Sequence, residues 1–173
     1  MFPSRFLLFL TVLLVYLSQD VVYSASASFE KTESKFITYN SPVESFINVS
    51  GLKSSLSSSA VVTAQIWVAH TYNWDLTIRL YGPDGNYITL SNQRGGEYDN
   101  VFNGTIFTDS ASKSVSTYSF SNNIVATSLK PEQPFSNFRG KNPNGKWKLW
   151  INDGYSTDNG QLYGFIFNIQ GNI

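Results

Sequence analysis

Hydrophobic and polar residues alternate with a period of two over several short stretches of the chain, a pattern that predicts β-strands. The clearest stretch is "AVVTAQIWVAHTY" (60–72), whose opposite face is mixed and includes Trp67. The expected inward row consists of Val62, Ala64, Ile66, Val68 and His70. The alternation therefore predicts a strand that ends on an inward-facing histidine.

Similar alternation recurs along the chain at 75–82, 87–91, 145–153 and 161–171. Weaker strand candidates are 44–50, 105–111 and 115–122. Trp147 heads the inward row of 145–153, and Gly85 closes the "GPDGN" turn, which joins two of the strands as a hairpin. No segment keeps a 3.6-residue period, so we expect an all-β sandwich or barrel. It should form one domain over 44–173, and the polar segment 28–43, which lacks periodicity, should be a loose N-terminal arm.

The first 27 residues have the features of a secretory signal peptide. Arg5 precedes an apolar run from Phe6 to Leu17, and Ala25-Ser26-Ala27 fits an A-x-A cleavage signature. Cleavage after Ser24 is the alternative. The run is shorter than the roughly 20 residues that a membrane helix needs. We therefore predict a secreted, extracellular protein without a membrane segment after cleavage.

Composition narrows the function classes. The chain has 12 basic and 12 acidic residues and net charge zero, which argues against a nucleic-acid or anionic-membrane partner. It has no cysteine, so a thiol nucleophile and a cysteine-based zinc site are excluded. Aromatic residues make up 16% of the chain, which agrees with an all-β domain.

Four blocks in order give a more specific pattern. They are "IWVAHTYNWDLTIRLYGPDG", "GGEYDNVFNGTIFTDSA" (95–111), "FRGKNPNGKWKLWIND" (138–153) and "GQLYGFIFNI" (160–169). Because it carries these four blocks in this order, the chain resembles the P domain, or P/Homo B domain, of proprotein convertases and related microbial proteases. In those proteins the module lies beside a subtilisin-like catalytic domain. The resemblance implies a jelly-roll β-sandwich similar to galactose-binding domains, with His70, Gly85, Trp147 and Gly160 in structural positions. The resemblance covers this module alone, and we expect no protease domain within these 173 residues.

His70, the single histidine, and Asp75 raise the alternative of a hydrolase site. A serine hydrolase needs a base oriented by a carboxylate, a serine on a sharp turn and oxyanion donors. The chain has no G-x-S-x-G elbow, and His70 continues a buried row. We therefore expect a scaffold histidine and no catalytic residues, so that serine endopeptidase activity is associated with the chain only through its family.

Calcium is the one cofactor for which candidate ligands exist, because it takes six to eight oxygen ligands from carboxylates and carbonyls. The candidates are Asp75, Asp99, Asp109 and Asp153. The resemblance adds that some microbial P domains hold calcium in this acidic loop region. The alternative is that these acids cap turns.

Two further kinds of site follow from the residues. Trp67, Trp74 and Trp150 are candidates for contacting a carbohydrate, as in other galactose-binding-like modules, or else they pack internally. Asn48 and Asn103 begin N-x-S/T sequons and could carry glycans in a secreted chain. The leading hypothesis is a secreted, non-catalytic P/Homo B-like module that binds or stabilises a subtilisin-like protease or another extracellular protein; the alternative is a carbohydrate-binding module.

Overall fold

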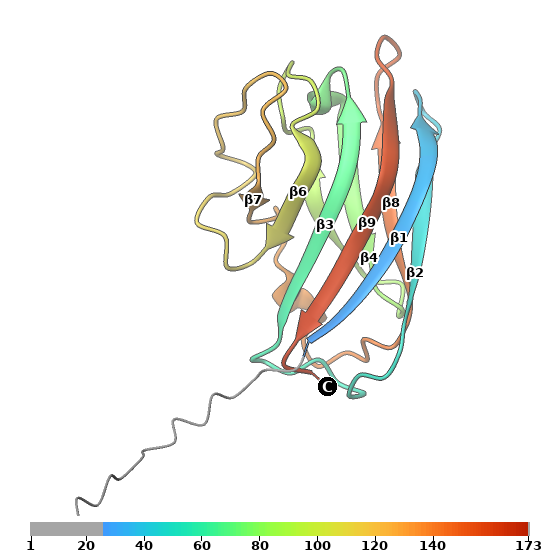
Figure 1. Cartoon of the computed structure of the whole chain (residues 1–173), viewed down its shortest axis with the longest axis vertical. Helices are drawn as coiled ribbons and strands as arrows, with labels where there is room; N and C mark the ends of the chain where they lie inside the picture. The colour runs from blue at the N-terminus through green and yellow to red at the C-terminus, as the bar shows by residue number, and fades with distance from the viewer. Residues whose placement is uncertain (1–25, 173) are drawn as a thin grey trace, which may run out of the picture.

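The computed structural model describes residues 26–172, which form a two-layer β-sandwich (Figure 1). One sheet has five strands in the order β1-β9-β3-β6-β7, and the other has four in the order β2-β8-β4-β5. The expected all-β sandwich is confirmed, and it is consistent with a jelly roll. The expected signal peptide lies almost wholly outside the described residues. Within them no helix is long and apolar enough to cross a membrane.

The strands agree closely with the alternating stretches. Their bounds are β1 Ser26–Ile37, β2 Val43–Val49, β3 Val61–His70, β4 Leu76–Tyr81, β5 Tyr87–Asn92, β6 Phe102–Thr108, β7 Ser128–Leu129, β8 Gly145–Asp153 and β9 Gly160–Gln170. Two short 3-10 helices, η1 Asn73–Asp75 and η2 Phe135–Phe138, complete the regular structure. The weak candidate 115–122 is turn and loop, and the two-residue β7 has no sequence signature.

The segment 28–43 departs from expectation. Instead of a loose arm, most of it belongs to β1, an edge strand that pairs along its length with β9. Phe29 and Ile37 face the core, but the positions of the same parity between them carry Lys31, Glu33 and Lys35, of which Lys31 is exposed. The charged residues therefore interrupt the hydrophobic alternation in the middle of the strand. Charged residues on an edge strand also hinder pairing with other chains. The segment is held by backbone pairing with the apolar strand β9. The periodicity of the sequence gives no information about such pairing.

The core lies between the sheets and is closed by aromatic rings. Trp147 on β8 is 1% exposed, and its ring centroid lies 4.2 Å from that of Phe167 on β9 and 4.8 Å from that of Phe138 in η2. The indole N–H of Trp147 donates to the Pro143 carbonyl at 2.7 Å. A buried tryptophan with its N–H satisfied is a strong packing element. The structural position expected for Trp147 is thus occupied by a residue that links the two sheets.

The sandwich has two distinct ends. Strand β9 ends at the lower end in Figure 1, and β3 reaches the opposite, upper end, where β9 begins. The β3–β4 corner and the β8–β9 loop therefore meet at the upper end. This end holds most of the polar side chains discussed below.

Candidate functional site

The β3–β4 corner is held by side-chain hydrogen bonds to the backbone. Asn73, fully buried in η1, donates from Nδ2 to the carbonyls of His70 at 3.1 Å and Tyr98 at 2.6 Å. The His70 N–H donates to Asn100 Oδ1 at 3.2 Å. These bonds tie the corner to the loop that follows β5, so the chain leaves β3 in a fixed direction.

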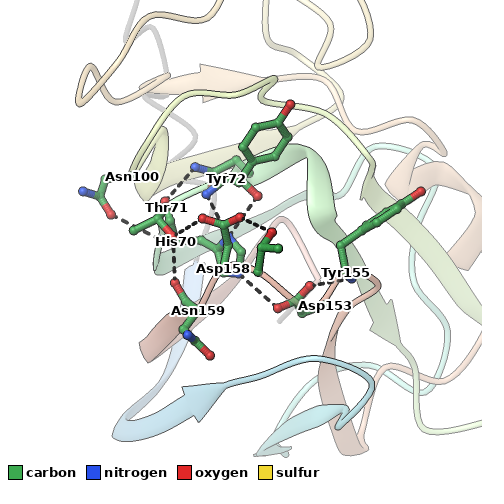
Figure 2. A network of polar contacts seen from close by, with 10 residues as sticks. His70, Thr71, Tyr72, Asn100, Asp153, Tyr155, Asp158 and Asn159 are labelled. Atoms are coloured by element: carbon green, nitrogen blue, oxygen red, sulfur yellow. Dashed lines mark hydrogen bonds and ion pairs between the residues drawn. The ribbon is translucent and has the colours of Figure 1, made fainter.

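His70 and Asp153 form a buried pair, visible in Figure 2. His70 Nε2 lies 3.4 Å from Asp153 Oδ2, and both side chains are fully buried. Nδ1 lies 2.9 Å from the carbonyl oxygen and 3.1 Å from the amide nitrogen of Tyr72. Asp153 also accepts the Tyr155 N–H at 2.9 Å. Within residues 26–172 the partners of the ring are thus backbone groups and a buried carboxylate, and no serine hydroxyl is among them.

Gly160 makes room for this pair. It lies opposite His70 in the β3–β9 ladder, and a Cβ there would stand 2.4 Å from the Ala69 carbonyl oxygen and 2.5 Å from His70 Cδ2. No side chain larger than hydrogen fits that space without displacement. Gly85, by contrast, has open space around it and a φ of +80°, which its turn requires.

Asp75 lies next to this pair but has a different environment. It is 5% exposed, yet no donor within residues 26–172 hydrogen-bonds to its carboxylate. Burial raises the pKa of Asp75, and the negative charge of Asp153 raises it further, while His70 opposes the rise. Sequence reasoning placed Asp75 at the mouth of β4 without showing that its charge is unpaired.

A pocket of about 210 Å³ opens beside Asp75. Its lining residues are Tyr72, Trp74, Asp75, Tyr155, Thr157 and Asp158. The ring centroids of Trp74 and Tyr155 are 5.2 Å apart, and these two side chains are 38% and 42% exposed. Asp158 accepts hydrogen bonds from Thr71 and Thr157, both at 2.8 Å, which lower its pKa. Figure 2 shows Asp158 and Tyr155 reaching this corner from the β8–β9 loop.

Tyr155, Thr157 and Tyr72 were not identified from the sequence as site residues. Two of them lie in "GYSTDNG", which has the composition of an ordinary turn. The presence of aromatic and hydroxyl side chains in a turn was the available signal. Their closeness to Trp74 depends on the pairing of β4 with β8, which brings the two loops together.

The four calcium candidates do not gather at one place. Asp109 caps η2 instead, because its two carboxylate oxygens accept the N–H groups of Phe135 at 2.8 Å and Ser136 at 3.0 Å. Asp99 lies in the β5–β6 loop, where its backbone bonds to Asn122 and Asn123. Among residues 26–172, no three His, Asp or Glu side chains form a group suited to a metal ion. Because protein donors already engage Asp109 and Asp153, the set of four does not fit a single calcium site.

The remaining candidate residues lie on the strands. Trp67 is half-buried on β3 and lines a pocket of about 230 Å³ with Tyr163. Trp150 is half-buried on β8, and the Arg79 guanidinium lies 5.1 Å from its ring centroid. Asn48 is exposed on β2, whereas Asn103 is half-buried in β6, opposite Trp67, rather than in a loop. The three tryptophans thus lie in three separate settings.

The chain is similar to known proteins in both its sequence and its fold. The family model described as "Proprotein convertase P-domain" matches residues 59–169, more than half of the chain. A serine protease of Aeromonas sobria in complex with the chaperone has a similar fold, with a TM-score of 0.53 and 15% identity over 86% of this chain. The same protease solved as "serine protease of Aeromonas sobria" gives a TM-score of 0.50 at 15% identity over 85% of this chain.

In both cases the match spans 27% of the protease chain, so the chain corresponds to about a quarter of that protein. At this identity the likeness concerns the fold alone. The family model rests on the sequence and spans β3 to β9, including the His70 corner, Trp147 and Gly160. The chain therefore belongs to the proprotein convertase P-domain family.

Proposed function

We propose that the chain is a secreted, non-catalytic module that binds and stabilises a subtilisin-like serine protease. The observation that carries this proposal is the P-domain match over residues 59–169, because that family is an accessory domain of such proteases. The fold likeness to a serine protease of Aeromonas sobria points the same way. Another extracellular protein is the alternative partner.

The proposal that the module is non-catalytic is supported by the surroundings of His70. A general base must reach the nucleophile whose proton it takes. Here the imidazole is buried, and its nitrogens face Tyr72 and Asp153. A fluorophosphonate probe, which labels activated serines, should leave the purified chain unlabelled. Labelling that is lost in a folded His70→Ala variant would overturn this part of the proposal.

Protease binding can be tested with the same probe. The full chain is immobilised, and culture medium from the cells that naturally produce it is passed over the surface. The serine hydrolases that are retained are then labelled with the probe. We expect a labelled protease on the folded chain but not on a heat-unfolded sample. Adding the free chain should also lengthen the half-life of that protease at elevated temperature. A blank surface, or an unchanged half-life, would contradict the proposal.

Secretion is proposed from the first 27 residues and can be tested by mass spectrometry of the exported product. In the structure Ser26 and Ala27 pair with Gln170 and Ile169. Cleavage after Ser24 would keep these pairs, and cleavage after Ala27 would remove them. The mature N-terminus therefore distinguishes the two sites, and retention of residues 1–24 would contradict a cleaved signal peptide. Glycans on Asn48 or Asn103 would appear as a mass loss after glycosidase treatment.

Carbohydrate binding is a second candidate, favoured by the pocket beside Trp67. That pocket presents Trp67 and Tyr163, the latter 47% exposed, next to Glu30. Aromatic faces with nearby polar groups suit sugar rings. A glycan array probed with wild type and with Trp67→Ala tests it, and an array without wild-type binding would contradict this candidate.

Calcium binding also remains a proposal, resting on Asp99 in the β5–β6 loop rather than on all four acids. Thermal melting with calcium and with a chelator tests it, because a ligand that binds only the native state raises Tm. An unchanged midpoint would contradict a structural calcium site.

A further inference from the structure

The pocket beside Asp75 has no role in the scaffold described above. Its walls are aromatic: Trp74 and Tyr155 meet at an interplanar angle of 40°, and Tyr72 adds a third ring. The backbone N–H of Trp74 donates to the Gly96 carbonyl at 3.0 Å, and the Tyr155 hydroxyl accepts from Gln93 Nε2 at 3.2 Å. The backbone of Trp74 and the hydroxyl of Tyr155 are thus held in place while both rings are partly exposed, and aromatic faces of this kind attract cations.

The floor of the pocket carries an unpartnered charge. Asp75 is nineteen-twentieths buried and lines the pocket, and no donor in the described part of the chain bonds to its carboxylate. Buried carboxylates are ordinarily paired or hydrogen-bonded. Asp158 adds a second negative charge at the rim, and none of the six lining residues is basic. The charges that line the pocket therefore favour a cation over a neutral or anionic group.

The size of the pocket limits what can enter. About 210 Å³ is below the roughly 300–1,000 Å³ of ordinary small-molecule sites, so it suits the head of one side chain. A hard divalent ion would need six to eight oxygen ligands, and the aromatic walls supply few. An organic cation uses both the rings and the carboxylates.

We propose that this pocket binds the cationic head of one arginine or lysine side chain presented by a protein partner. The guanidinium or ammonium group would face Asp75 and stack against Trp74 and Tyr155. The assignment of the cation to a protein partner rests on the proposed function. The preference of the pocket for an organic cation is independent of that function.

The test is a titration of the full chain, ¹⁵N-labelled at tryptophan, with N-acetyl-arginine amide. N-acetyl-citrulline amide, which has the same shape but no charge, is the matched ligand. The indole signal of Trp74, assigned with Trp74→Phe, should shift saturably with arginine amide, with a Kd on the order of millimolar, and stay fixed with citrulline amide. No shift with arginine amide, or equal shifts with both, would overturn the proposal.

Variants locate the site. Asp75→Asn should weaken binding about tenfold, because a charge-assisted contact is lost. Trp74→Ala should weaken it roughly threefold to tenfold, followed through a Tyr155 side-chain signal. Glu44→Gln and Tyr87→Ala, a carboxylate and an aromatic ring outside the pocket, should leave Kd unchanged. If folded Asp75→Asn and Trp74→Ala bind as the wild type does, the proposal is wrong.

Calcium alone is the last comparison. If calcium shifts the same Trp74 signal at submillimolar concentration and displaces arginine amide, the pocket is an inorganic cation site and the proposal fails. The experiment is separable from protease capture. Arginine binding without a captured protease would contradict only the proposed function, and a captured protease without arginine binding would contradict only this inference.

Discussion

Asp153 and Asp75 are neighbouring carboxylates at the same end of the sandwich, and they differ in their hydrogen-bond partners and in their access to a pocket. Asp153 is fully buried and has His70 and the Tyr155 N–H as partners. Asp75 is nearly as buried but has no hydrogen-bond donor, and it faces an open pocket. A carboxylate engaged by protein donors belongs to the scaffold, whereas one that faces an open pocket without such a donor can be stabilised by a ligand. The four predictions below test that contrast.

The largest expected effect comes from removing the partner of Asp153. His70→Ala should lower the free energy of unfolding by about 3–5 kcal/mol, because a buried carboxylate is left without its counterpart. Urea unfolding measures the loss. In the double variant with Asp153→Asn the loss should be smaller than the sum of the two single effects. A cost below about 1 kcal/mol for His70→Ala would mean that the pair does not hold the corner.

A smaller loss is expected when the space around His70 is filled. Gly160→Ala should cost about 1–3 kcal/mol, because its Cβ would collide with the Ala69 carbonyl oxygen and the His70 ring. Gly154→Ala, at the other end of the β8–β9 loop, is the matched control, since its Cβ would meet the nearest atom at an ordinary 3.6 Å. Equal unfolding midpoints for the two variants would count against tight packing at Gly160.

Asp109 extends the comparison to a third carboxylate, one that caps a helix. Asp109→Ala should cost about 1–2 kcal/mol, because two N–H groups at the start of η2 lose their acceptor. The loss should be the same with calcium and with chelator present, as measured by thermal melting. A loss that appears only with calcium would instead indicate a metal ligand.

The smallest effect is a gain. Asp75→Asn should raise Tm by a few degrees at pH 7, because burial beside Asp153 raises the pKa of Asp75 and so disfavours its ionised form in the folded state. A raised pKa means that wild-type stability increases as pH falls through it, so the advantage of the variant should shrink towards pH 4. Melts at pH 7, 5 and 4 check this. A variant that is less stable at pH 7 would show that Asp75 has a partner.

Much of the fold was predictable from the chain alone. The row ending in His70, the Gly85 turn and the buried Trp147 follow from alternation and turn chemistry, which act between residues close in sequence. Strand β1 was missed because Lys31, Glu33 and Lys35 interrupt the alternation between Phe29 and Ile37, and the pairing with β9 is not visible in the sequence. Asp109 was taken as a metal candidate because the sequence does not show that η2 folds against it.

The sequence by itself determined the strands, their buried faces and the family to which the chain belongs. The tertiary structure decided which carboxylates have partners. Residues 70 and 153, or 74 and 155, meet only because β3 and β8 end, and β4 and β9 begin, at the same end of the sandwich. Whether a charge is paired depends on such distances, and local pattern carries no information about them. The contrast between a satisfied Asp153 and an unsatisfied Asp75 is therefore a property of the folded chain.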